Sequence, residues 1–149
     1  MEITKATFDD LPKILNLQKL AYLSEAKLNN NYSIQPLTQT LKELENEYGK
    51  KIILKLVDNN THEIIGSIRA YEENDRVYVG KLMVHPDYQN KGYGTKLLNT
   101  IETFYENKTF ELFTSSKSER NLYLYNKNGY KEYKREKKSD NLEMVFMEK

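Results

Sequence analysis

The chain has 149 residues, of which 38% are hydrophobic and 30% are charged, and its formal net charge at pH 7 is only +1. This length and hydrophobic content fit one globular domain with one core and exclude a disordered tail. The balanced charge gives no basic footprint, so we expect no nucleic-acid partner. The chain has no cysteine, and its only histidines are His62 and His85. Disulfides, a cysteine nucleophile, thiolate metal ligands and a histidine-rich metal site are therefore excluded, and we expect no metal.

The N-terminus lacks the apolar run of a signal peptide, because Met1–Thr7 is polar and alternating. No apolar stretch elsewhere approaches the length needed to span a bilayer. We therefore expect a cytoplasmic protein without a membrane partner, present as a monomer or a homodimer.

The first third of the chain predicts a strand followed by two helices. Residues Glu2–Thr7 alternate between apolar and polar side chains, as in a short strand. Asp9 as an N-cap and Pro12 in the first turn begin a helix, which apolar residues at helical spacing continue to about Lys27. A turn at Gln35–Thr38 comes next. The second helix is indicated by Leu37, Leu41, Leu44 and Tyr48, with Gly49 at its end.

The central part of the chain changes from helical to strand periodicity. Three runs rich in Ile, Leu and Val follow one another, at Lys51–Asp58, Glu63–Tyr71 and Arg76–Val84. The turn signals Asn59-Asn60 and Glu72–Asp75 separate them. Short polar turns between strands are typical of an antiparallel meander.

The last third predicts a crossover helix and a closing group of strands. Thr95–Tyr105 has one apolar helical face, and Phe110–Thr114 is the strand that follows it. Leu122–Lys127 is a short helix, and Tyr130–Arg135 and Leu142–Met147 are a closing pair of strands. Without any repeat or linker, residues 1–149 form a single domain of α+β character with one βαβ-like crossover.

A polar loop between the third central strand and the crossover helix carries the chemistry. Gly92 and Gly94 let the backbone approach a ligand, and Lys91 adds a positive charge. The unpaired N–H groups and the positive dipole at the start of the helix favour a phosphate or pyrophosphate. A strand–helix turn that needs glycine only for its conformation is the alternative. The P-loop lysine and Ser/Thr pair are absent, and Leu97 replaces the last glycine of the dinucleotide pattern.

The loop resembles the coenzyme A signature of the GNAT superfamily of N-acyltransferases. That signature is Q/R-x-x-G-x-G/A after a strand that ends in Val-x-Pro. Here it reads Gln89-Asn90-Lys91-Gly92-Tyr93-Gly94, preceded by Leu82–Pro86. A second block, Ser118–Tyr130, is similar to the family's Leu-Tyr helix followed by Gly-Phe or Gly-Tyr. The resemblance implies a single GNAT-like domain whose mixed, mostly antiparallel central sheet is flanked by helices and has splayed central strands.

The resemblance also implies roles for individual residues. The strand residues Leu82, Met83 and Val84 would pair with the pantetheine arm of coenzyme A. Ser118 and Asn121 would flank that arm, although the family often has Asn at the first position and a small residue at the second. Tyr125 would lie beside the sulfur. The pyrophosphate would be held by Gln89, Asn90, Lys91, Gly92, Tyr93, Gly94 and Thr95.

The implied reaction is the transfer of an acetyl group from acetyl-CoA to a primary amine by direct attack in a ternary complex. The acceptor would be a small molecule or a protein amine. An alkylamine has a pKa of about 10, so a general base is needed to supply the neutral nucleophile. Tyr125 is the candidate acid for the leaving thiolate, and a backbone N–H near Met83–Val84 is the candidate oxyanion donor.

The sequence does not identify the base. The family often uses a glutamate on the central strands, but Val77–Val84 contains none. Glu72 and Glu73 are expected at a solvated hairpin tip, and His85 at a structural strand end. Two alternatives therefore remain open: a catalytically inactive acyl-CoA-binding regulatory module, and a nucleotide-binding protein that uses the same loop for phosphate.

Overall fold

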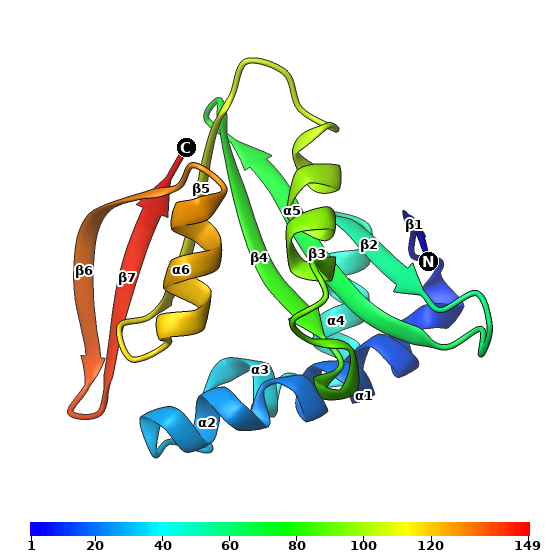
Figure 1. Cartoon of the computed structure of the whole chain (residues 1–149), viewed down its shortest axis with the longest axis horizontal. Coiled ribbons are helices and arrows are strands. Elements are labelled where there is room, and N and C mark those ends of the chain that lie inside the picture. The colour runs from blue at the N-terminus through cyan, green and yellow to red at the C-terminus, as the bar shows by residue number, and fades with distance from the viewer.

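A seven-stranded sheet with the order β1-β2-β3-β4-β5-β7-β6 organises the molecule (Figure 1). The computed structural model describes all residues, 1–149. The strands are β1 (Glu2–Lys5), β2 (Ile52–Val57), β3 (Ile64–Glu73), β4 (Arg76–Val84), β5 (Thr109–Ser115), β6 (Lys131–Ser139) and β7 (Leu142–Glu148). The α-helices are α1 (Leu11–Ala21), α2 (Leu23–Asn29), α3 (Gln35–Thr38), α4 (Leu41–Tyr48), α5 (Tyr93–Glu102) and α6 (Glu119–Lys127). Short 3-10 turns are η1 (Phe8–Asp10) and η2 (Pro86–Tyr88).

The sheet is mixed and mostly antiparallel, which confirms the predicted α+β class. Strands β1 to β4 form the expected meander, and β4 and β5 are the only parallel pair. The β3–β4 hairpin closes where Glu73 pairs with Arg76. Asn74 and Asp75 between them have φ of 53° and 63°, the left-handed pair that a type I′ turn requires.

The central strands β4 and β5 separate after a short paired segment. They pair only from Arg76–Tyr78 to Thr109–Glu111, and beyond that point the ribbons diverge (Figure 1). The β3–β4 pairing shifts between Ser67 and Arg69, and Lys81 on β4 has φ of 52°. An extra residue of this kind is a β-bulge, which bends its strand. The predicted splay is therefore present, and it leaves backbone groups of β4 without a strand partner.

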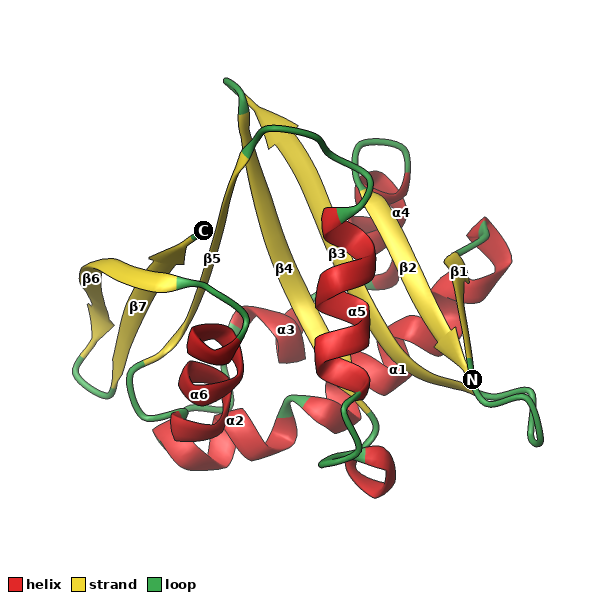
Figure 2. Ribbon diagram, turned by 45° about the horizontal axis from the view of Figure 1, so that its top comes forward, coloured by secondary structure: helices red, strands yellow, loops and turns green.

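Helices cover both faces of the sheet (Figure 2). Helix α5 buries Leu97, Leu98 and Ile101 in the larger core cluster, together with residues of the central strands. It approaches β3 closely, because a Cβ on Gly66 would lie 3.0 Å from Leu97 Cδ1. Helices α1 and α4 pack on the opposite face around a smaller cluster that includes Ile14. No helix combines the length and the apolar character that crossing a membrane requires.

The predicted first helix is wrong in two respects. The N-cap of α1 is Asp10 and not Asp9, which lies within η1, and the structure divides the helix into α1 and α2 at Tyr22. This residue caps α1 with φ of −86° and ψ of −1°. Its side chain turns towards β4, where the hydroxyl donates a hydrogen bond to the Leu82 carbonyl over 3.3 Å. A tertiary contact decides this break, and it turns α2 across the open end of the splay. The predicted turn at Gln35–Thr38 is a single helical turn, α3.

Candidate active site

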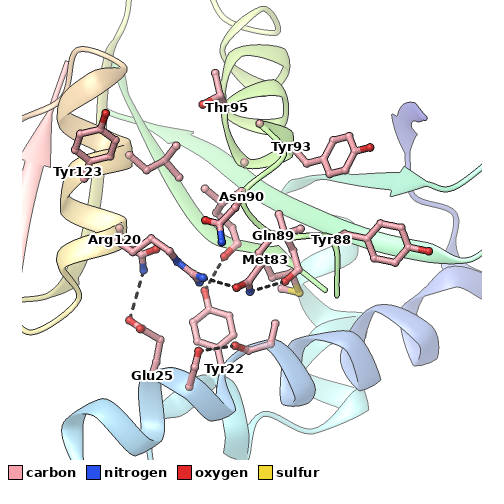
Figure 3. A pocket seen from close by; sticks show the side chains of 18 of the residues that line it. Tyr22, Glu25, Met83, Tyr88, Gln89, Asn90, Tyr93, Thr95, Arg120 and Tyr123 are labelled. Atoms are coloured by element: carbon pink, nitrogen blue, oxygen red, sulfur yellow. Dashed lines mark hydrogen bonds between the residues drawn. The ribbon is translucent and has the colours of Figure 1, made fainter. Parts of the chain in front are cut away.

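A cavity of about 370 Å³ lies beside β4 at the open end of the splay (Figure 3). Its walls come from β4, the loop before α5, the first turn of α5, helix α6 and the α1–α2 corner. All but two of the predicted cofactor residues line it. Those that line it are Leu82, Met83, Val84, Gln89, Asn90, Gly92, Tyr93, Gly94, Thr95 and Asn121.

The loop geometry fits a diphosphate. Gly92 is the N-cap of α5 with φ of +84°, and no side chain caps the helix there. A Cβ on Gly92 would meet no atom within 4 Å, so the space above the loop is open. The first N–H groups of a helix have no partner within it and carry its positive dipole. At Gly94, in contrast, a Cβ would lie 3.2 Å from Leu124 of α6, so this glycine allows the two helices to approach.

An interaction that the sequence did not reveal joins the loop to α6 across the cavity. The Gln89 amide donates a hydrogen bond to the Val84 carbonyl over 3.1 Å. The guanidinium of Arg120 donates to the side-chain oxygen of Gln89 (Figure 3). Arg120 and Lys127 both line this cavity and add positive charge to the helix N-terminus. The only sequence signal for Arg120 was its place next to Asn121.

Two predicted cofactor residues lie outside the cavity wall. The ammonium of Lys91 lies over the ring of Tyr88, 5.8 Å from its centroid, on the exposed side of the loop. Ser118 is only 3% exposed, and its hydroxyl donates to Glu25 Oε2 over 3.2 Å. Its side chain therefore contacts an acid and not the space for a cofactor. Direct cofactor contacts from these two residues stay predictions.

The backbone of β4 faces the cavity at alternate residues. The carbonyls of Leu82 and Val84 accept bonds from Tyr22 and Gln89, both of which line the cavity. In a strand the N–H of a residue points to the same side as its own carbonyl, and the next residue points away. The N–H groups of Leu82 and Val84 therefore face the cavity, whereas Met83 faces its partner strand β3.

A second cavity of about 450 Å³ lies deeper between the splayed strands. It shares four residues with the first, namely Tyr22, Glu25, Leu82 and Asn121. Tyr125, the predicted acid, lines this second cavity and not the first. The two cavities therefore adjoin at the α1–α2 corner.

Glu25 of α2 is the carboxylate at this junction (Figure 3). Ser118 donates to one of its oxygens, and the Asn121 amide lies 3.4 Å from the other. Burial raises the pKa of Glu25 above its usual range, and the Ser118 hydrogen bond and the charge of Arg120 partly offset that rise. A carboxylate whose pKa is raised is a stronger base and is suited to accept a proton. The sequence did not single out Glu25, because it lies on a different segment, more than 50 residues before β4 and the loop.

Tyr125 of α6 is 6% exposed, and its ring packs edge-on against Tyr130 with centroids 6.1 Å apart. Its hydroxyl has no hydrogen-bond partner in the chain. Burial, followed by the neighbouring Tyr22 and Glu25, raises the pKa of Tyr125, so the hydroxyl keeps its proton at neutral pH. The structure thus leaves this proton available to a group in the second cavity.

The other acids considered from the sequence lie elsewhere. Glu72 is ion-paired with Lys108 over 3.0 Å at the end of the β3–β4 hairpin, and Glu73 closes that hairpin. The Nδ1 atom of His85 accepts a bond from the Asp87 N–H over 3.1 Å, which caps η2. None of the three lines either cavity. The expectation that they are structural agrees with this placement.

Comparison with known proteins places the chain in a family. A family model described as the acetyltransferase (GNAT) domain matches residues 23–149. The fold is similar to that of the PaiA N-acetyltransferase from Thermoplasma acidophilum in complex with coenzyme A. The TM-score is 0.78 at 19% identity, over 97% of this chain and 96% of that one.

It is also similar to the ribosomal-protein-S18-alanine N-acetyltransferase from Escherichia coli. Here the TM-score is 0.80 at 17% identity, over 99% of this chain and 91% of that one. An aminoglycoside 6'-N-acetyltransferase complexed with coenzyme A gives a TM-score of 0.77 at 18% identity, over 100% of this chain and 96% of that one. No functionally curated protein sequence matches the chain significantly. Because the family model covers most of the chain and the fold agrees throughout, this chain belongs to the GNAT superfamily of acetyltransferases.

Proposed function

We propose that the protein transfers an acetyl group from acetyl-CoA to a primary amine by direct attack. The observation that carries this proposal is the junction of the two cavities. There Glu25 and Asn121 line both cavities, and Tyr125 lines the second. A buried carboxylate and an unpaired hydroxyl at one junction supply the base and the acid that amine acylation needs.

The donor is expected in the first cavity. The first turn of α5 and the open space at Gly92 would hold the pyrophosphate, with Arg120 and Lys127 supplying charge. The free edge of β4 at Leu82 and Val84 would pair with the pantetheine amides. The bound thioester supplies an acyl carbon that is open to attack by an amine.

Glu25 is our candidate general base, since no other carboxylate lines both cavities. An acceptor ammonium has to lose two protons on its way to an amide. Glu25 would remove the first, directly or through one water, and pass it to solvent. The second balances the proton that the leaving sulfur gains when the new C–N bond forms and the C–S bond breaks.

Tyr125 would donate that proton to the sulfur. Its hydroxyl is protonated at neutral pH and has no partner that competes for its hydrogen. The cavity-facing N–H of Leu82 or Val84 would donate to the carbonyl oxygen as negative charge develops there. The acceptor is thus a small-molecule or protein amine, the range spanned by the acceptors that the names of the similar solved structures give.

The first test is binding of the donor. Acetyl-CoA should raise the melting temperature, because a ligand in hundredfold excess over its Kd stabilises the native state by about 2.7 kcal/mol. ATP and NAD serve as controls, since a nucleotide-binding protein would prefer them. No shift with millimolar acetyl-CoA would contradict the proposal. A single-turnover assay with an amine panel then separates an enzyme from an acyl-CoA-binding module that has no activity.

A further inference from the structure

The second cavity has an unusual distribution of charge, which bears on the acceptor. Five of its lining residues other than Glu25 are ionic: Lys51, Arg69, Lys81, Glu111 and Lys138. Most have partners within the chain. Glu111 accepts from Arg76 over 2.8 Å, and Lys138 pairs with Glu136 over 2.9 Å.

Lys81 is the exception, because its ammonium forms no ion pair and no hydrogen bond in the structure. It is partly buried and stands on the β4 bulge with φ of 52°. Burial, and then the charge of Arg69, lowers the pKa of Lys81 to about 8. The group is therefore still mostly charged at pH 7, although its surroundings disfavour that charge. A charge held in this way favours the entry of an anion.

The neighbours of Lys81 do not neutralise it. Arg69 is 1% exposed and lies 3.6 Å from Glu47, and Lys51 is 2.8 Å from the same carboxylate. Arg69 and Lys51 thus share the carboxylate of Glu47, and Lys81 has no carboxylate partner. Arg69 also donates to Gln18 and Gln39, but its Nε is the one buried side-chain nitrogen or oxygen without any partner. Unused donors and excess positive charge occur together here.

We propose that the acceptor is an amine that also carries an anionic group, foremost a carboxylate. The amine would lie at Glu25 and the anion at Lys81, with Arg69 and Lys51 strengthening the positive potential. A cavity of about 450 Å³ accommodates a molecule the size of an amino acid. Polyamines are disfavoured, because a second ammonium would face this excess of positive charge. The inference rests on the proposed function and specifies its acceptor.

Matched pairs of acceptors test the proposal on the intact protein with acetyl-CoA. Each pair differs only in the anion: amino acids and their decarboxylated amines, with several spacings between amine and carboxylate. A charge-assisted hydrogen bond should favour the anionic member by about tenfold to hundredfold in kcat/KM, mainly through KM. Phosphoethanolamine and ethanolamine form one further pair, which distinguishes phosphate from carboxylate. Higher kcat/KM for the members that lack the anion, diamines included, would overturn the proposal.

Variants of Lys81 locate the effect. Lys81→Met should remove the preference by lowering kcat/KM for the member that carries the anion about tenfold or more, while the value for its decarboxylated partner stays nearly unchanged. Lys81→Glu should shift the preference towards diamines. Lys13→Met, on the exposed face of α1, is the matched control. Equal losses for both members of a pair in Lys81→Met would also overturn the proposal.

The proposed acceptor can be wrong even if the protein is an N-acetyltransferase, and the measurements distinguish the two cases. A protein that binds acetyl-CoA and acetylates only polyamines would be an N-acetyltransferase with a different acceptor. A protein that does not bind acetyl-CoA would contradict both. If no acceptor in the panel turns over, binding of the amino carboxylates to the coenzyme A complex is measured by calorimetry. The absence of binding then counts against the proposal.

Discussion

The two cavities that meet at Glu25 are built in different ways. The first cavity is formed largely by one continuous stretch, from β4 through the glycine loop into α5, and much of its binding capacity is backbone. The second is formed by side chains from segments as distant as Tyr22, Arg69 and Met144. A binding site made of backbone tolerates changes in sequence and holds a constant ligand. A site made of side chains can change its ligand with a few substitutions, as expected of the cavity that we propose for the acceptor.

The comparison predicts that substitutions divide into two groups. Changes on the donor side should alter affinity for acetyl-CoA. Changes at Glu25 or in the second cavity should alter turnover or acceptor choice, while the affinity for acetyl-CoA stays the same.

The largest effect is expected for Glu25→Gln, which keeps the shape of the side chain and removes the base. General acid–base catalysis contributes about 10²–10⁴-fold, so kcat should fall by about 10³-fold. Affinity for acetyl-CoA, measured by calorimetry, should stay near that of the wild type. Asp140→Asn, an exposed change in the β6–β7 turn, is the control. Wild-type kcat in Glu25→Gln would show that another group accepts the proton.

The same variant has an expected signature in its pH profile. Wild-type activity should rise with pH as Glu25 loses its proton, and Glu25→Gln should lack that rise. The free energy of unfolding is expected to change with pH in the opposite direction to the activity. A carboxyl whose pKa is raised in the folded state destabilises that state as pH increases through the folded pKa. Glu25→Gln should therefore be at least as stable as wild type at pH 7 in thermal unfolding.

The next effect concerns the donor side. Gly92→Val should weaken acetyl-CoA binding by about 10²-fold or more. A β-branched residue at φ of +84° is strained, and its side chain would enter the space open to the pyrophosphate. Gly49→Val is the matched control, because a Cβ there also meets nothing within 4 Å but the backbone is not left-handed. Unchanged affinity in a folded Gly92→Val protein would show that the loop does not bind the cofactor.

A somewhat smaller effect is expected for Tyr125→Phe. The change keeps the ring that packs on Tyr130 and removes only the hydroxyl. The single-turnover rate under saturating amine should fall on the order of 10²-fold, with acetyl-CoA affinity nearly unchanged. Tyr32→Phe, at an exposed tyrosine that lines neither cavity, controls for loss of a hydroxyl. If the two variants have equal rates, Tyr125 only packs beside the site.

The smallest effect is expected for Ser118→Ala, which removes a hydrogen-bond donor to Glu25. The Ser118 hydrogen bond lowers the pKa of Glu25, so its loss should move the acidic limb of the pH–rate profile to higher pH. Turnover above that limb should change only a few-fold. A large loss of acetyl-CoA affinity would instead support the role that family resemblance implied for Ser118.

The sequence by itself was sufficient for the parts of the protein that depend on neighbouring residues. The meander of β2, β3 and β4 followed from strand periodicity and turn residues such as Asn74-Asp75. The binding loop followed from Gln89–Gly94 placed between a strand and a helix. Both features use local backbone conformation, which residue order over ten to twenty positions determines. For the same reason, most predicted cofactor residues line one cavity.

Only the tertiary structure decided the break at Tyr22, the hydrogen-bond partners of Ser118 and Arg120, and the position of Glu25. Each depends on a contact between segments far apart in the chain, such as the Tyr22 hydroxyl with the Leu82 carbonyl, 60 positions away. Periodicity along α1 and α2 reads as one helix, because the reason for its break lies on β4. A carboxylate becomes a candidate base through burial and neighbours, and neither is encoded in its own segment. The sequence therefore predicted the loop residues of the first cavity, whereas the position of Glu25 and most of the lining of the second cavity emerged only from the fold.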